Sequence, residues 1–155
     1  MKRLISVFLL TTTFVIVCSA QEPDAYLAGF NSSYEAEYFK KYNDAIVAME
    51  KIYSGTSYEI NLRLGWLQYQ NGNYSKSESY YKKAVELQPK SIEAKLGLAN
   101  AVTGLGNWDQ LMTIYEDILK LDPNNSSINY KLAYMLHSRK KMTQALDYIK
   151  IVLTH

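Results

Sequence analysis

The sequence predicts an all-α fold, a solenoid of antiparallel helix pairs, and three observations support this prediction. Residues 58–89 align without a gap to residues 92–123, at a constant offset of 34 positions. Within each unit, apolar residues recur at the spacing of a helix face. A glycine interrupts each unit near its middle, and a proline ends it. The composition, 48% hydrophobic and 21% charged, is typical of a chain that folds around a core.

Residues 1–20 are typical of a secretory signal peptide. Lys2 and Arg3 form a basic start, residues 4–17 are largely apolar, and Cys18-Ser19-Ala20 offers the small residues that precede cleavage. The apolar stretch is short for a bilayer span, which needs about 20 residues. We therefore expect cleavage after Ala20 and export to the periplasm or the medium, with retention as an anchor as the alternative. The compact signal and the lack of disulfides suggest a Gram-negative bacterium.

Loss of this signal changes the charge and the cysteine content. Without Lys2 and Arg3 the 17 basic residues fall to 15, equal to the 15 acidic residues. The mature chain then has no basic excess for nucleic acid or anionic lipid. Cys18, the single cysteine, leaves as well, so no disulfide or thiolate metal ligand is expected.

The region before the clear repeats divides into two parts. Residues 21–33 contain Pro, Gly and an Asn-Ser-Ser run, and we expect this segment to be loose. Residues 34–57 look like a degenerate capping repeat. Its second helix is marked by apolar residues at helical spacing, namely Tyr42, Ala45, Met49 and Ile52.

Three units follow, over residues 58–91, 92–125 and 126–155. In the first, a helix with two apolar stripes runs to the Asn71-Gly72-Asn73 break, and a second helix is expected over residues 74–87. Ser57, Ser91 and Ser126 stand where a side-chain oxygen can cap the next helix. In the third unit Lys140 replaces the turn glycine, so a left-handed backbone there costs about 1 kcal/mol.

These units resemble the tetratricopeptide repeat. The resemblance rests on the 34-residue period, the Leu-Gly or Leu-Ala pair in the first helix, the turn glycine, the aromatic residue two positions later and the closing proline. It covers residues 58–155 strongly. It implies a right-handed superhelix whose first helices line a concave groove that binds peptides or partner proteins.

If that superhelix forms, the second stripe of each first helix faces the groove. These candidate partner-binding residues are Leu62, Trp66, Tyr69, Leu96, Asn100, Thr103, Tyr130, Tyr134 and His137. Trp and Tyr are enriched at binding hot spots, which favours a binding role. The alternative is that the aromatic rings fill the interior of a short solenoid and touch no ligand. An acidic-tail clamp of the kind some family members use would be incomplete here, with Arg63, Asn100 and Lys131 in place.

The C-terminal end of the repeats lacks the helix that usually covers the last unit. The final helix, expected over residues 142–153, places Tyr148 and Ile151 outside its main apolar stripe. A second copy or another partner is therefore expected to cover this face, giving a possible homo-oligomer. The alternative is that both side chains are scattered and partly exposed.

No arrangement of residues indicates an enzyme. There is no metal-binding His pair, phosphate-binding glycine loop or nucleophile elbow, so we expect no catalytic residue, no metal and no cofactor. Three functions remain open. The first is a non-enzymatic scaffold that binds a protein segment in its aromatic groove. The second is a structural subunit that self-associates through its C-terminal repeat, and the weakest is carbohydrate binding through the aromatic rings.

Overall fold

The computed structural model describes residues 23–154, which form eight α-helices and no strand. The expected signal peptide, residues 1–20, lies outside the described residues. The helices are α1 (Pro23–Tyr38), α2 (Tyr42–Glu50), α3 (Tyr58–Gln70), α4 (Tyr74–Leu87), α5 (Ile92–Gly104), α6 (Trp108–Leu119), α7 (Ser126–Ser138) and α8 (Met142–Thr154).

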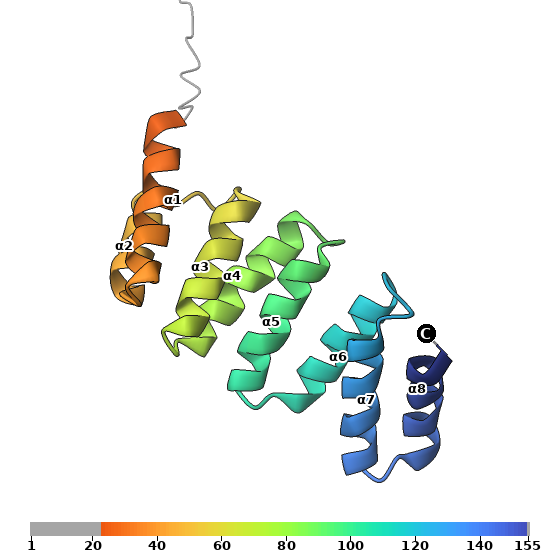
Figure 1. Ribbon diagram of the computed structural model, residues 1–155. Helices are drawn as coiled ribbons and strands as arrows, with labels where there is room; N and C mark the ends of the chain where they lie inside the picture. Colours follow the sequence, from red (N-terminus) through yellow and green to blue (C-terminus); the bar gives the residue numbers. More distant parts are fainter. Residues whose placement is uncertain (1–22, 155) are drawn as a thin grey trace, which may run out of the picture.

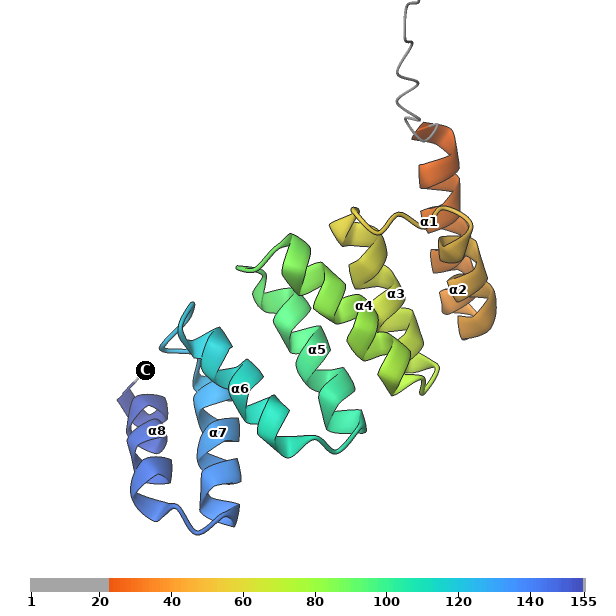
Figure 2. The same cartoon turned by 180° about the vertical axis from the view of Figure 1, so that it is seen from behind.

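The helices form four consecutive pairs, stacked so that α1 and α8 lie at opposite ends of the molecule (Figure 1). The first helices of the pairs, α3 and α5 among them, line one side. The view from behind brings α4 and α6 to the front (Figure 2). The all-α prediction is confirmed for the described residues.

Two groups of buried side chains hold the pairs together. One joins α2 to α3 and contains Met49, Ile60 and Leu64, all inaccessible to solvent. The other extends from α4 to α7 around Tyr81 and Ile118. Because each group bridges successive pairs, the buried side chains are distributed along the solenoid in two groups rather than gathered in one centre.

The turns within the pairs use left-handed backbone, as their sequences predicted. Gly72 and Gly106 have φ angles of 76° and 71°, which glycine adopts without steric cost. Lys140 takes the same position in the last pair with φ 61°, which confirms the sequence expectation. Lys40, between α1 and α2, has φ 57° and was not anticipated.

Two sequence expectations differ from the structure. The segment expected to be loose, residues 21–33, is helical from Pro23, because Tyr26 and Phe30 pack against the core group of α2 and α3. The cap of α7 is also one residue earlier than expected. Asn125, not Ser126, accepts the hydrogen bond from the amide of Ile128, at 3.1 Å.

Candidate binding groove

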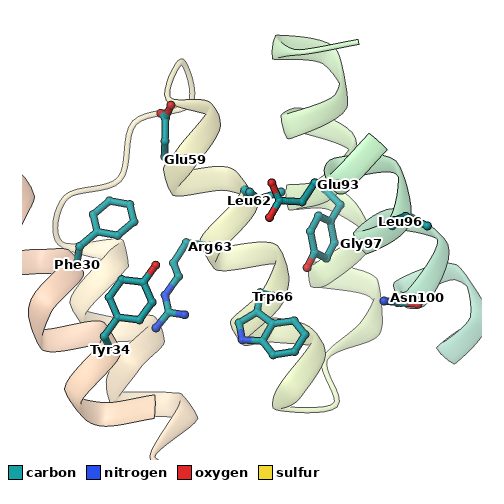
Figure 3. A pocket seen from close by; sticks show the side chains of 11 residues that line it. Phe30, Tyr34, Glu59, Leu62, Arg63, Trp66, Glu93, Leu96, Gly97 and Asn100 are labelled. Atoms are coloured by element: carbon teal, nitrogen blue, oxygen red, sulfur yellow. The ribbon is translucent and has the colours of Figure 1, made fainter. Parts of the chain in front are cut away.

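The concave side contains a cavity of about 680 Å³ between α1, α3 and α5, which we call the first cavity (Figure 3). Its walls are mostly apolar and aromatic, and they carry four polar or charged side chains. The lining residues are Phe30, Tyr34, Glu59, Leu62, Arg63, Trp66, Tyr81, Glu93, Leu96, Gly97 and Asn100.

Two further cavities continue the groove toward the C-terminal end. The second, about 610 Å³, lies between α5, α6 and α7, and it shares Asn100 with the first. The third, about 450 Å³, lies between α7 and α8 and shares Tyr130 and Tyr134 with the second. These shared walls join the three cavities into one surface, which we call the groove.

The structure places all but one of the predicted groove residues in these walls. Leu62, Trp66, Leu96 and Asn100 line the first cavity, Thr103, Tyr130 and Tyr134 the second, and His137 the third. Tyr69 lines none of them. Its ring stacks on Trp66, with 6.3 Å between centroids, and lies 5.6 Å from the ring of Tyr74.

The aromatic residues of the groove are open to solvent. Trp66 is 39% exposed, Tyr130 57% and Tyr134 66%. Rings with this exposure do not fill the interior of the solenoid. They form a row of large apolar faces on the concave side, one of which comes from α3 and two from α7.

A polar network fixes the wall between α1 and α3. The Arg63 side chain donates from Nε to Ser33 Oγ at 3.1 Å and pairs through Nη1 with Glu37 Oε2 at 2.5 Å. Trp66 Nε1 donates to the other oxygen of Glu37 at 2.7 Å. The Tyr34 ring covers the guanidinium, with 3.9 Å from the Arg63 Cζ atom to the ring centroid. The indole is thus held at a set orientation.

Charge changes sign along the groove. The first cavity has Glu59 and Glu93 in its walls, whereas the second has Lys131 and Arg139. Arg139 pairs with Asp109 at 2.8 Å, and the Lys131 ammonium lies 5.6 Å from the centroid of the Tyr115 ring. The electrostatic environment therefore differs between the first and the second cavity.

Burial changes the ionisation of the tyrosines that connect groove and core. It raises the pKa of Tyr81 well above its usual range, and the nearby Glu93 carboxylate adds to this effect. Burial also raises the pKa of Tyr115. Both hydroxyls therefore ionise only at a higher pH than an exposed tyrosine does.

Several groove residues escaped the sequence analysis. Phe30 and Tyr34 line the first cavity, and Glu37 holds its wall through Arg63 and Trp66. All three lie on α1, whose residues 23–33 were expected to be loose. Ser33 and Glu37 are four positions apart, so the spacing of one helix face was present but was not used. Arg63 was considered only as part of an acidic-tail clamp, although the structure gives it an internal partner.

In the C-terminal helix, the exposed apolar side chains are not the ones that the sequence predicted. Tyr148 packs against the core group of α4 to α7, and burial raises its pKa, while Ile151 is half-buried. The most exposed apolar side chains of α8 are Leu153, Leu146 and Met142. This end of the molecule does expose apolar side chains, but Leu153, Leu146 and Met142 contribute more to them than Tyr148.

The described residues offer no group of three or more His, Cys, Asp or Glu side chains that could hold a metal ion. Within residues 23–154, no helix has the length and hydrophobicity required to cross a bilayer.

Comparison with known proteins supports the fold. Residues 58–91 match the family described as Tetratricopeptide repeat. The crystal structure of MamA has a TM-score of 0.75 at 18% identity, covering 86% of this chain and 79% of that one. MamA from Desulfovibrio magneticus RS-1, residue 41 to the end, gives 0.72 at 12% identity, covering 84% and 75%.

The second TPR domain of human RPAP3, solved in complex with an HSP70 peptide, has a TM-score of 0.63 at 18% identity, covering 72% of this chain and 95% of that one. No curated protein matches the sequence significantly. The chain is an all-α solenoid protein with a concave groove. Its fold is that of tetratricopeptide-repeat proteins, as the repeat spacing predicted.

Proposed function

We propose that this chain is a non-enzymatic scaffold that binds an extended segment of a partner protein in its groove. The observation that carries the proposal is the row of exposed rings, Trp66, Tyr130 and Tyr134, in the walls of connected cavities. Rigid aromatic side chains supply contact area at low entropic cost and dominate many protein interfaces. The structural similarity to the RPAP3 domain, which was solved with a bound peptide, supports this function.

Affinity purification of the tagged full chain from its native host tests the proposal. We expect a partner to be retained by the wild type and lost by the Tyr130→Ala, Tyr134→Ala variant. Tyr38→Ala is the matched control, because this tyrosine is also exposed but lines none of the three cavities. Equal retention by the wild type and the groove variant would contradict the proposal.

We further propose that the chain works outside the cytoplasm, in the periplasm or the medium. The basic start and short apolar stretch of residues 1–20 support this location. Mass spectrometry of the protein from its native host measures the mature N-terminus. A first residue of Gln21 is expected, and a chain that retains Met1 would contradict cleavage.

Self-association is a second candidate function, favoured by the apolar surface at the C-terminal end. Leu146 lines the third cavity and is 58% exposed, and within residues 23–154 only α7 packs against α8. Sedimentation velocity at micromolar concentration tests this function. A wild-type oligomer should dissociate in Leu146→Glu and persist in Leu105→Glu, an exposed leucine outside the groove. A monomeric wild type would rule out this candidate.

A further inference from the structure

The first cavity carries two carboxylates that have no cationic partner. Glu59 and Glu93 lie in the first turns of α3 and α5, and both are exposed. Glu59 accepts one hydrogen bond, from Ser57 Oγ at 3.0 Å. Within residues 23–154, neither carboxylate forms an ion pair with a basic side chain. Figure 3 shows both at the same end of the cavity.

The charge of these carboxylates is not cancelled within the cavity. Arg63 is the basic residue among its lining side chains, and Glu37 already neutralises it. Helix dipoles stabilise acidic residues in a first turn, which explains why Glu59 and Glu93 are tolerated without a cation. The helix dipoles do not neutralise the carboxylates, so the cavity keeps a net negative charge. Its volume leaves room for a ligand.

The walls beside the carboxylates are suited to a cation. Tyr34, Trp66 and Tyr81 line the cavity with aromatic rings, of which those of Tyr34 and Trp66 are labelled in Figure 3. The faces of aromatic rings attract ammonium and guanidinium groups, and apolar walls accept the methylene stem of lysine or arginine. Glu93 lies close enough to Tyr81 to affect its ionisation, so a carboxylate and an aromatic ring face the same space.

A second, independent observation indicates that a ligand enters here. Arg63 is only 8% exposed, and its Nη2 atom has no hydrogen-bond acceptor although the other two nitrogens are paired. A buried donor without a partner is unfavourable, so such a group is commonly completed by a ligand or a water. The main-chain carbonyl oxygens of an extended peptide are suitable acceptors. Because Nη2 has almost no accessible surface, they reach it only when the side chains that cover the guanidinium, Tyr34 among them, move aside.

We propose that the first cavity is a subsite for a lysine or arginine side chain of the partner segment. The cationic group lies between Glu59 and Glu93 against the aromatic walls, and a main-chain carbonyl of the same segment accepts a hydrogen bond from Arg63 Nη2. This inference rests on the proposed function, since it specifies the chemistry of the segment bound in that groove. Lys131 and Arg139 line the second cavity, so we expect the preference for a cation in the first cavity and not in the second.

A library of short synthetic peptides, in which one position at a time is Lys, Arg, Glu or Ala, tests the subsite on the full chain. Binding is measured by fluorescence anisotropy. We expect one peptide position at which Lys or Arg binds about tenfold more tightly than Glu. The Glu59→Gln, Glu93→Gln variant keeps the shape of both side chains and should lose this preference.

Two further variants separate charge in the cavity from other effects. Glu86→Gln, Asp117→Asn removes two exposed charges that do not line the first cavity, and it should keep the preference. Arg63→Lys retains a cation for Glu37 but lacks Nη2. Because a main-chain contact is independent of peptide sequence, this variant should weaken all peptides by a similar factor and leave the preference unchanged.

The outcomes distinguish the subsite from the proposed function. If peptides bind and depend on Tyr130 and Tyr134 but show no preference for a cation, the subsite is wrong and the scaffold function stands. A preference that persists in Glu59→Gln, Glu93→Gln also overturns the subsite. If no peptide binds the wild type, both are overturned.

Discussion

At the scale of single residues, Tyr81 connects the core to the groove. It is almost fully buried in the group of α4 to α7, and it also lines the first cavity. Its ring packs directly on the backbone of two helices, where Gly65 and Gly97 leave space for it. The position of this ring therefore sets how closely α3 and α5 approach each other, and with it the shape of the cavity.

Gly97→Ala should reduce the free energy of unfolding by about 2 kcal/mol, the usual cost of overpacking a core. A Cβ atom at this position would come 2.1 Å from Tyr81 Cε1, so the ring or the helix must move. Urea unfolding followed by circular dichroism measures the change. Gly55→Ala is the control, since its Cβ would come no closer than 3.6 Å to another residue. Equal stability of both variants would contradict the packing argument.

Tyr81→Phe should make the protein less sensitive to alkaline pH. Because burial raises the pKa of Tyr81 in the folded state, the unfolded chain releases this proton first, at a pH of about 10. The stability that Tyr81 contributes is complete below that pH and is lost above it, at up to about 1.4 kcal/mol per pH unit. Free energies of unfolding at neutral and alkaline pH check this. Tyr130→Phe, at an exposed ring, should lose stability as the wild type does.

At the scale of elements, hydrogen bonds at the helix starts determine where each repeat begins. Ser57 and Ser91 accept from the amides of Ile60 and Ala94, as their sequence positions predicted. In the last repeat Asn125 takes this role. Asn61 and Asn129, two repeats apart, each donate to two carbonyls of the preceding loop, which ties successive repeats together.

Asn125→Ala should destabilise the protein by about 1 kcal/mol, because the first turn of α7 loses its side-chain cap. Ser126→Ala should have almost no effect, since its hydroxyl forms no cap. Thermal unfolding of the two variants compares the positions directly. The reverse order of stability would restore the sequence expectation that Ser126 is the cap.

At the scale of the whole molecule, stability is distributed along the solenoid in sequence order. Each helix packs mainly on its neighbours in the chain, so the two end pairs are supported from one side only. Among the residues of α8, only Ala145 is fully buried. The C-terminal end thus combines exposed apolar side chains with little burial in its last helix.

Hydrogen exchange should show this gradient. Amides of α8 are expected to exchange faster than those of α4 and α5, because local opening of a terminal helix breaks fewer buried contacts. Mass spectrometry of peptides after exchange in D₂O gives the comparison. Equal protection of α8 and α4 in a monomeric sample would argue against the proposed distribution of stability.

Most of the groove was predictable from the sequence because the repeat spacing places every fourth or third residue of a first helix on the same face. Leu62, Leu96 and Tyr130, one from each repeat, all line cavities as predicted. The contribution of α1 was not predictable by this argument, because its sequence lacks the repeat pattern. The charge of the first cavity was not predicted either, because Glu59 and Glu93 lie outside the apolar stripes from which the groove was inferred.

The sequence by itself determined the all-α class, the repeat length, the helix pairs and the left-handed turn at Lys140, because these depend on local periodicity and on the backbone preferences of single residues. Only the tertiary structure decided which side chains from separate helices meet. Arg63, Ser33 and Glu37 form one network between α1 and α3, and Tyr148 packs against the core group of α4 to α7. Such contacts depend on packing between helices, which periodicity within one helix does not specify.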